Sequence, residues 1–351
     1  MQITVKGRGA QLNPHNPFLS EIRSKQPFLF NDEKEEGKLR TNIIEVDAKS
    51  ILTKNTSPDV PGAYSVNPYQ GCEHGCAYCY ARNTHPYWGY SAGLDFETQI
   101  MVKRNAPELL DKALSRKSWK ASPIMLSGNT DCYQPIEKKF MITRRLLEVF
   151  WKHKHPVSII TKNSLILRDI DILKNMALHN LVHVSVSINT LDDKLRQKLE
   201  PRTASVNKRL QLIKALTDQG IPVTALAAPI IPGLNDQDII PLVKKVAEAG
   251  ARTVRQIVVR LNGDVAEIFS DWLGHHYPDR RSKVLNKIKS LHGGKLGNSI
   301  LGNRMKGSGI IADIIHQQFD LARRLFLMEE QPFSYNLDLY EMSKKTQLSL
   351  F

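Results

Sequence analysis

The sequence has few cysteines and no long hydrophobic run. Only four cysteines occur among 351 residues, which excludes a disulfide-stapled scaffold. The longest apolar stretch, around residues 221–231, is too short to span a bilayer, and the first residues contain no apolar signal-peptide core. We therefore expect a cytoplasmic protein with no membrane contact.

Acidic residues are also scarce relative to basic ones. The chain has 49 Lys and Arg against 35 Asp and Glu, a formal net charge of +14. This excess suits contact with a polyanion, although solubility alone would also account for it. With 41% hydrophobic and 24% charged residues, the composition is typical of a globular protein and argues against a mainly disordered chain, a coiled coil or a collagen.

Short β-branched or apolar runs alternate with amphipathic segments from about residue 63 onward. Apolar residues such as Ile142, Leu146 and Val149 recur at helical spacing between the runs. Asn235 or Asp236 is placed to begin one helix, and Gly220 and Gly250 are placed to end two. The expected strands are residues 63–68, 123–128, 157–161, 182–188, 223–230 and 254–261.

Six strand–helix units predict an α/β fold with a parallel sheet and right-handed crossovers. Six is short of the eight strands that close a full barrel, so the pattern alone allows either a partial (βα)6 barrel of the TIM type or a doubly wound sheet. In both architectures ligands bind at the carboxyl ends of the strands.

Four regions are expected along the chain. Residues 1–62 are polar and turn-rich and predict an irregular extension, and residues 63–265 form the barrel core. Residues 266–335 predict a basic, mostly helical segment, in which eight Lys or Arg and one Asp lie between His275 and Lys306. This cluster suits the phosphates of a nucleic acid, and a solvated basic helix and loop is the alternative. Residues 336–351 predict a polar tail.

Three of the four cysteines fall within eight residues. Cys72, Cys76 and Cys79 have the spacing C-x3-C-x2-C in a loop after the first predicted core strand. Three such thiolates can hold three irons of a [4Fe–4S] cluster and leave the fourth iron open to a substrate or cofactor. Gly71 lets the backbone wrap closely around the cluster. A structural zinc site with His74 as fourth ligand is the alternative, although zinc sites normally use two separated ligand pairs.

This loop resembles the signature of radical S-adenosylmethionine (SAM) enzymes, with Tyr78 as the aromatic residue before the third cysteine. The longer strings from Asn67 to Ala81 and from Thr130 to Glu137 are similar to the branch related to spore photoproduct lyase, a DNA repair family. The resemblance implies a partial (βα)6 barrel, a [4Fe–4S] cluster, SAM, and an external electron donor. It also implies that reductive cleavage of SAM yields a 5′-deoxyadenosyl radical, which removes a hydrogen from the substrate.

The resemblance also implies which residues contact SAM. Lys162 and Arg202 would pair with its carboxylate, and Ser187 would bind its ribose hydroxyls. The backbone around Ile230 would meet the adenine, and Tyr78 would lie beside the cofactors. The SAM amine would meet a loop containing Gly128, Asn129 and Thr130, which departs from the commoner Gly-Gly-Glu form.

Cys132 lies 53 residues after the cysteine loop, near the end of a predicted strand. The lyase family uses a cysteine as a hydrogen donor, so Cys132 is a candidate for that role. A redox-sensitive thiol and an ordinary buried thiol are the alternatives.

The sequence ends in Gln347-Leu-Ser-Leu-Phe351. This string resembles the peptide by which bacterial repair and replication proteins bind the DNA polymerase sliding clamp. Gln347 would bond the rim of the clamp groove, and the apolar side chains would fill its pockets. A C-terminus that folds onto its own domain is the alternative. The apolar anchors are Leu348, Leu350 and Phe351.

Three hypotheses follow from these features. The first is a radical SAM enzyme that acts on DNA, in base-damage repair at the sliding clamp. The second keeps the enzyme and changes the substrate to RNA, a protein or a small molecule. The third is a non-catalytic iron–sulfur protein that binds DNA and the clamp.

Overall fold

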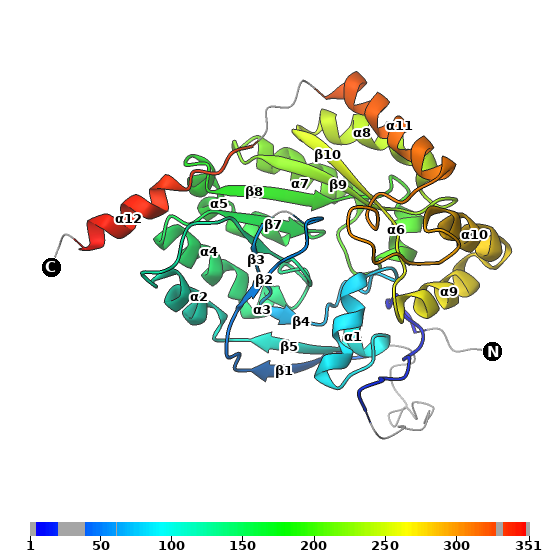
Figure 1. The fold of residues 1–351 in the computed structure, drawn as a ribbon, viewed down its shortest axis with the longest axis horizontal. Coiled ribbons are helices and arrows are strands. Elements are labelled where there is room, and N and C mark those ends of the chain that lie inside the picture. Colours follow the sequence, from blue (N-terminus) through cyan, green and yellow to red (C-terminus); the bar gives the residue numbers. More distant parts are fainter. Residues whose placement is uncertain (1–4, 20–38, 61, 328–332, 349–351) are drawn as a thin grey trace.

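The computed structural model describes residues 5–19, 39–60, 62–327 and 333–348. Within these residues two β-sheets form the framework (Figure 1). The larger sheet has the order β10-β9-β8-β7-β6-β3-β2, and the smaller one has the order β1-β5-β4. The larger sheet contains β2 (Leu52–Lys54), β3 (Tyr64–Val66), β6 (Ile124–Leu126), β7 (Val157–Thr161), β8 (Val182–Ser187), β9 (Val223–Ile230) and β10 (Thr253–Val258). The smaller sheet contains β1 (Asn42–Val46), β4 (Tyr69–Gln70) and β5 (Gln99–Lys103).

All six predicted core strands are present in the larger sheet. They are β3, β6, β7, β8, β9 and β10, which lie side by side in chain order with parallel pairing throughout. The bounds of β7 and β9 are those predicted. The prediction of an α/β fold with a parallel sheet is therefore confirmed. Only β2, which pairs antiparallel with β3, extends the sheet beyond this set.

The helices that connect the core strands share one face of the sheet, because right-handed crossovers between strands in chain order place them there. Their apolar faces and the sheet bury the main core, which includes Val157, Ile159, Leu212 and Val243. Gly220 and Gly250 follow two of these helices with positive φ angles of 74° and 97°. The helices on this face include α2 (Ala106–Leu114), α4 (Ile142–Lys152), α5 (Ile170–Ala177), α7 (Val206–Thr217) and α8 (Ile239–Glu248). The connections also contain the short helices α3 (Glu137–Phe140) and α6 (Asp193–Leu199).

The start of α8 differs from the prediction. Neither Asn235 nor Asp236 caps the α-helix, since a short 3-10 turn at Asp236–Asp238 precedes it. The Asn235 side chain instead bonds the backbone of the preceding loop, where its Oδ1 accepts from the Ile231 amide at 2.6 Å. The side chain that resembled a helix cap therefore fixes the loop after β9.

The described residues among the first 62 include two strands, where an irregular extension was predicted. They contribute β1 to the smaller sheet and β2 to the larger one. The partner of β1 is β5, a strand that the sequence pattern did not indicate, and the two are parallel with Asn42 opposite Gln99. Such a pairing depends on residues far apart in the chain, and the half-exposed sequence of β1 carries little periodic signal.

The C-terminal part is helical and differs from the prediction in its last element. Helix α1 (Leu94–Thr98), α9 (Val265–His276) and α6 gather at the carboxyl ends of the core strands (Figure 1). Helices α10 (Arg281–Leu291) and α11 (Ile310–Phe326) follow, and α11 packs on α8. A polar tail was expected after residue 335, but α12 (Asp338–Leu348) lies there. Tyr340 anchors α12, because its buried hydroxyl donates to the Leu114 carbonyl at 2.6 Å.

None of the helices in the described part of the chain is long and apolar enough to cross a membrane.

Candidate metal centre and binding site

The cysteine loop follows β4 at the carboxyl ends of the core strands. Cys72 and Cys76 are buried and Cys79 is half-buried. Gly71 and Gly75 adopt φ angles of 79° and 65°, which disfavour residues with a Cβ. A Cβ on Gly75 would also lie 2.6 Å from a carboxylate oxygen of Glu97. The backbone turns of the loop at these two positions therefore need glycine.

The thiols sit in a protein environment that shifts their pKa values. Burial raises the pKa of Cys76 and Cys79 above the ordinary value, and the neighbouring thiols raise it further. Lys162 lowers the pKa of both thiols, and Arg82 lowers that of Cys79. A group that takes several thiolates needs such nearby cations to offset its negative charge. The donor set therefore fits an iron–sulfur cluster.

His74 does not complete a metal site with the cysteines. Its Nδ1 faces Asp131 Oδ2 at 3.3 Å, and its Nε2 faces Asn163 Nδ2 at 3.3 Å. Burial disfavours the imidazolium, but Asp131 and Cys72 outweigh it and raise the pKa of His74 to about 9. Across residues 5–19, 39–60, 62–327 and 333–348, no three His, Cys, Asp or Glu side chains are arranged to hold a single metal ion. This arrangement does not favour the zinc alternative.

The segment from Thr130 to Glu137 holds the cysteine loop in place through side-chain hydrogen bonds to its backbone. Gln134 Nε2 donates to the Gly71 carbonyl at 3.1 Å, and its Oε1 accepts from the Glu73 amide at 2.9 Å. Asp131 accepts from the Lys162 amide at 2.8 Å while it faces His74. Two side chains of this motif therefore fix the loop position relative to β6 and β7.

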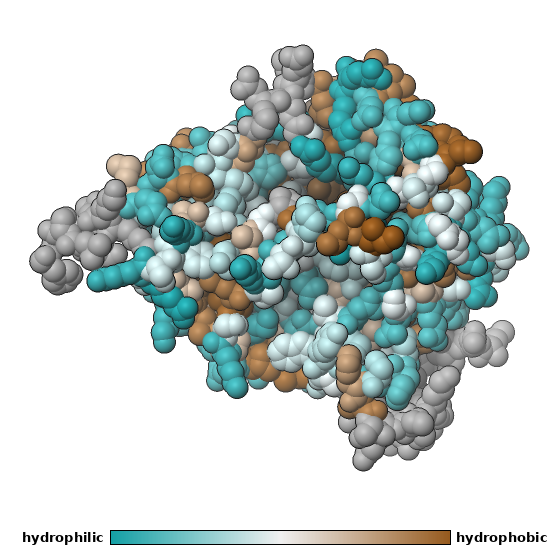
Figure 2. Space-filling model, viewed as in Figure 1, coloured by the Kyte–Doolittle hydropathy of each residue, from teal (hydrophilic) through white to brown (hydrophobic). Residues whose placement is uncertain are grey.

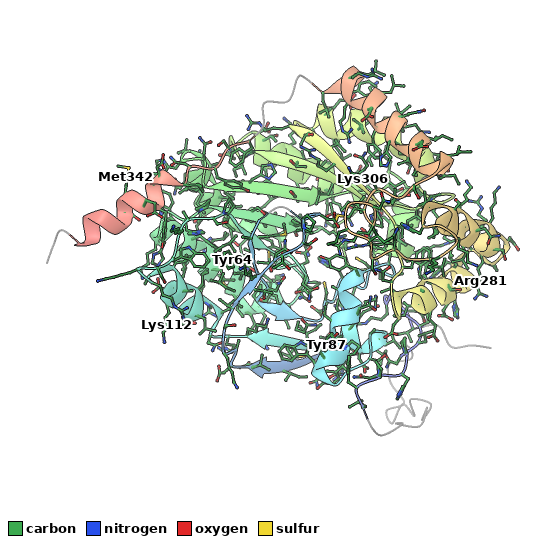
Figure 3. All side chains as sticks on the ribbon, in the orientation of Figure 1. Tyr64, Tyr87, Lys112, Arg281, Lys306 and Met342 are labelled. Carbon is green, nitrogen blue, oxygen red and sulfur yellow. The ribbon has the colours of Figure 1, made fainter. Side chains whose placement is uncertain are left out.

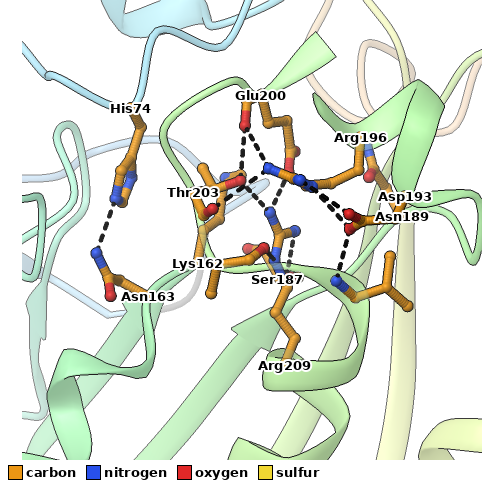
Figure 4. Close-up of polar contacts among 12 residues, drawn as sticks. His74, Lys162, Asn163, Ser187, Asn189, Asp193, Arg196, Glu200, Thr203 and Arg209 are labelled. Carbon is orange, nitrogen blue, oxygen red and sulfur yellow. Dashed lines mark hydrogen bonds and ion pairs between the residues drawn. The ribbon is translucent and has the colours of Figure 1, made fainter. Parts of the chain in front are cut away.

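A second support comes from the loop after α6 (Figure 4). The Ala77 amide donates to the Leu199 carbonyl at 3.0 Å, and the Tyr78 hydroxyl donates to Glu200. Burial opposes ionisation of Glu200, but the charges of Arg209 and Lys162 outweigh it and hold the pKa of this carboxyl below its ordinary value. Tyr78 is thus held by a buried carboxylate.

The N-terminal segment gives a third support, which the sequence analysis did not foresee. Glu97 is fully buried, and its carboxylate accepts from the amides of Gly9 at 3.0 Å and Ala10 at 2.8 Å. The same carboxylate pairs with Arg82 at 2.5 Å. Arg82 in turn donates to the Cys76 carbonyl at 3.0 Å. We call residues 8–10 the N-terminal strap, because they tie this buried ion pair to the cysteine loop.

The structure brings two of the predicted SAM contacts to the ends of adjacent strands. Lys162 follows β7, and Cys76, Glu200 and Asp131 raise the pKa of its ammonium against the effect of burial. Ser187 ends β8 and is buried, and its carbonyl accepts from Arg209 at 2.9 Å. Lys162 therefore lies near the thiols of the cysteine loop, and Ser187 ends the neighbouring strand (Figure 4).

Arg202 is near the cysteine loop but already has a protein partner. Its guanidinium lies 3.3 Å from Glu73, and its amide donates to the His74 carbonyl at 3.3 Å. It is therefore more closely tied to the loop than Lys162 is.

The loop after β6 uses its side chains within the protein. Thr130 Oγ1 donates to the Tyr69 carbonyl at 2.6 Å, and Asn129 Nδ2 donates to Thr84 at 3.2 Å. The Gly128 carbonyl accepts from the Tyr80 hydroxyl at 2.5 Å. Ile230 is fully buried at the end of β9.

Asn189 is a further polar residue at this edge of the sheet that the sequence analysis missed. It lies just past the end of β8 and is buried, and its Oδ1 has no hydrogen-bond partner. Its Nδ2 is 3.5 Å from the Pro229 carbonyl. An unpartnered buried oxygen costs free energy in the isolated protein, so it marks a place where a ligand donor fits. Its position two residues after Ser187 was the available signal.

Cys132 lies in the main core and is fully buried. Burial and the nearby Asp131 raise its pKa well above the ordinary value, and the hydroxyls of Ser127 and Thr143 contact the thiol. The thiol is therefore protonated at neutral pH. Its role as a hydrogen donor stays a prediction.

The predicted clamp peptide lies at the end of α12. Gln347 and Leu348 belong to the backbone of this helix. Leu350 and Phe351 lie outside the described residues.

Three comparisons with known proteins bear on this site. A family model described as the radical SAM superfamily matches residues 66–246. An uncharacterized protein of Mycobacterium tuberculosis is 34% identical over 242 residues, which cover 68% of this chain and 71% of that protein. An uncharacterized protein of Methanocaldococcus jannaschii is 32% identical over 250 residues, 71% of this chain and 88% of that protein.

An enzyme and a solved structure are also similar. The radical SAM Nalpha-GlyT isomerase of Pseudomonas phage M6 is 30% identical over 229 residues, 64% of this chain and 45% of that protein. The structure of spore photoproduct lyase complexed with dinucleoside spore photoproduct has a TM-score of 0.61 at 15% identity, and the match covers 86% of this chain and 83% of that one.

Proposed function

The chain belongs to the radical SAM superfamily, whose enzymes use a [4Fe–4S] cluster and SAM, and we propose that this enzyme acts on damaged bases in DNA. The observation that carries the proposal is the cysteine loop at the carboxyl ends of the parallel strands, where Cys72 and Cys79 are near enough to Cys76 to raise its pKa. When bound, the cluster and SAM supply a 5′-deoxyadenosyl radical that removes a hydrogen atom from the substrate. Formation of this radical requires reductive cleavage of SAM, for which an external electron donor provides one electron.

The three cysteines would hold the cluster. Cys72, Cys76 and Cys79 each provide one thiolate, and the absence of a fourth cysteine in the loop leaves one iron for SAM. The ammonium of Lys162 offsets the charge of the thiolates, since it already lies near Cys76 and Cys79. Burial of the loop keeps water from the reacting atoms.

Other residues would position SAM. The Lys162 ammonium pairs with the SAM carboxylate. Arg202, whose guanidinium also faces Glu73, is the second partner of that carboxylate. The buried Asn189 Oδ1, two residues after Ser187, accepts a hydrogen bond from a ribose hydroxyl, which satisfies an atom that otherwise has no partner.

Two further loops would contact the methionyl amine and the adenine of SAM. The backbone of Gly128, Asn129 and Thr130 meets the methionyl amine, because the two side chains in this loop are bonded within the protein. The backbone at Ile230 borders the adenine, and Tyr78 holds the cluster loop through Glu200. Six parallel strands in chain order support a partial (βα)6 barrel around these ligands.

DNA is the substrate class that the neighbours and the charge favour. Spore photoproduct lyase, whose structure contains a dinucleoside photoproduct, shares the fold, and this chain has a net charge of +14. A damaged base would have to leave the duplex to reach the cluster. Family membership argues against the non-catalytic alternative. Modification of RNA, a protein or a small molecule is the second candidate.

The test compares SAM cleavage and lesion loss in one reaction. Protein reconstituted with iron and sulfide under anaerobic conditions receives SAM, a reductant, and ultraviolet-irradiated or unirradiated DNA. We expect release of 5′-deoxyadenosine or methionine, and loss of a lesion from irradiated DNA only. Cys72→Ala should lose iron and SAM cleavage, whereas the matched control Cys132→Ala should keep its iron. Cleavage of SAM without a change in either DNA would move the proposal to another substrate class.

We also propose recruitment by the DNA polymerase sliding clamp. This proposal rests on the sequence Gln347-Leu-Ser-Leu-Phe351. Deletion of these five residues should abolish binding to purified clamp and leave SAM cleavage unchanged. Unchanged clamp binding would refute this part of the proposal.

A further inference from the structure

The segment between α10 and α11 crosses the carboxyl end of β10 and borders the candidate site. We call residues 295–307 the rim segment. The Val258 amide, at the end of β10, donates to the Met305 carbonyl at 3.0 Å. The Leu261 amide donates to the Leu296 carbonyl at 2.9 Å. The rim segment is thus held at two points to the strand end.

Asp59 fixes the middle of the rim segment from the other side. Its carboxylate accepts from the Gly302 amide at 2.6 Å and from Arg304 Nε at 2.5 Å. Both Gly302 and Arg304 hold the pKa of Asp59 below its ordinary value, against the effect of burial. The backbone on both sides of residues 300 and 301 is therefore fixed.

Two large apolar side chains stand at the outer tip of this fixed segment. Ile300 is 67% exposed and Leu301 is 53% exposed. Figure 2 shows apolar surface beside the central hollow of this face, where Figure 1 draws the segment between α10 and α11. Exposure of adjacent apolar side chains to water is unfavourable, so a partner that covers them gains free energy.

The rim segment lies next to the proposed cluster site. Arg260 follows β10, and its guanidinium lies 5.8 Å from the centre of the Tyr80 ring. Tyr80 is half-exposed and directly follows Cys79. Arg304 and Asp59 both influence the pKa of Arg260, so they are its neighbours. These contacts connect the rim segment to the cysteine loop through two side chains.

The surrounding surface is positively charged. Between Arg280 and Ala312 the sequence has eight Lys or Arg and no Asp or Glu. Arg280, Lys283 and Lys287 line a cavity of about 400 Å³ beside the loop after β9, where one carboxylate, Asp236, lies 3.9 Å from Lys287. Figure 3 shows Arg281 at the edge of the molecule opposite Met342 of α12, and Lys306 nearer the middle of this face.

We propose that α10 and the rim segment form a DNA-docking surface, in which the cations contact phosphates and Ile300 and Leu301 insert against unstacked bases. This inference rests on the proposed action on DNA. Cations along α10 would supply most of the affinity and its dependence on salt. An apolar wedge between base steps opens the duplex, and it would do so next to the cluster, where a base must leave the stack to react.

The charge of the surface identifies DNA rather than a peptide as the occupant. A docking groove for an apolar peptide would need an apolar surround, whereas the exposed residues that flank Ile300 and Leu301 include Lys295 and Lys306. The wedge predicts preference for weakly stacked sites, and the cations predict salt dependence.

The experiment measures DNA affinity of the reconstituted enzyme by fluorescence anisotropy. The probes are a labelled 20-base-pair duplex with one central mismatch and the same duplex fully paired, each at several salt concentrations. The double variant Ile300→Ser/Leu301→Ser should lose the preference for the mismatch by roughly fivefold or more and keep the salt dependence. Lys283→Gln/Lys289→Gln should reduce the slope of log affinity against log salt by about 1.8, or 0.9 for each phosphate contact.

Two matched controls lie on α5 and its C-terminal end. Leu178 is 73% exposed and Lys174 is exposed, and both lie at the amino-terminal side of β8, away from the site. Leu178→Ser and Lys174→Gln should leave affinity, mismatch preference and salt slope unchanged.

The outcomes separate this inference from the proposed function. Wild-type affinity and preference in the Ile300→Ser/Leu301→Ser variant would overturn the wedge even if the enzyme repairs DNA. Wild-type enzyme that cleaves SAM but binds neither duplex, and binds an acidic peptide instead, would overturn both proposals. Each variant should keep the circular dichroism spectrum and iron content of wild type, because all of the substituted side chains are exposed.

Discussion

The N-terminal strap predicts that one buried carboxylate controls the retention of the cluster. Glu97→Gln keeps the shape of the side chain but removes its charge. Arg82, which is fully buried, would then have no anionic partner. The new amide NH2 would also face the backbone N–H of Gly9 or Ala10, each of which now donates a hydrogen bond to the Glu97 carboxylate. Two unfavourable contacts would replace an ion pair and a hydrogen bond.

The expected loss is large. Removal of one partner from a buried ion pair costs about 3–5 kcal/mol, because the other charge stays desolvated. The cost falls on the contacts around Arg82, whose Nε bonds the Cys76 carbonyl, so the cysteine loop should loosen with the strap. We expect the free energy of unfolding in urea to fall by about 3–5 kcal/mol, and the iron content per chain to fall after gel filtration.

A matched control uses an exposed ion pair of the same types. Glu45 and Arg104 lie 2.8 Å apart, but their side chains are 49% and 58% exposed. Glu45→Gln should change the unfolding free energy by less than about 1 kcal/mol and leave iron content unchanged. Wild-type iron content in Glu97→Gln, with no greater loss of stability than in Glu45→Gln, would refute the control of cluster retention by Glu97.

Three further predictions concern separate parts of the molecule. Burial, with a smaller effect of His153, lowers the pKa of His155 to about 4, so neutral His155 stabilises the fold above pH 6.5 and this contribution is lost as the pH falls toward 4. Between pH 7 and 4.5 wild type should lose about 2.5 kcal/mol more unfolding free energy than His155→Gln, and an equal loss in both would contradict this. Tyr340→Phe removes the hydrogen bond to Leu114, which should lower the free energy of unfolding by about 1 kcal/mol and speed proteolysis within α12. A cleavage rate equal to that of wild type would contradict this. Asn189→Ala should weaken SAM binding roughly tenfold by calorimetry on protein with intact iron content, whereas unchanged affinity would remove Asn189 from the site.

Much of the parallel sheet was predictable because its core strands are largely buried and rich in apolar or β-branched residues. Runs such as Val157–Thr161 and Val223–Ile230 carry nearly continuous apolar or β-branched residues, and these became strands with the predicted bounds. The cysteine loop was predictable because its ligands are close in sequence. Local spacing is enough for a site that one short segment builds.

The supports around that loop were not predictable, because they join distant segments. Glu97 bonds residues 87 and 88 positions away, and no local pattern identifies such a pair. Asn235 shows the same limit from the other direction. Its sequence context resembled a helix cap, but the loop it stabilises is fixed by a carbonyl of Asn189, 46 positions away. Burial decides such roles, and burial follows from the assembled fold.

The close approach of Gly9 to Gly75 also constrains the order in which the protein matures. A Cβ at Gly9 would lie only 1.7 Å from the Gly75 carbonyl, so the two backbones pass in direct contact across the cysteine loop. Ribosomes release residue 9 before any cysteine has been made, yet its docking place exists only after Glu97 has emerged and folded. The N-terminal strap can therefore dock only after Glu97 has folded, and until then the cysteine loop lacks its contact with Gly9.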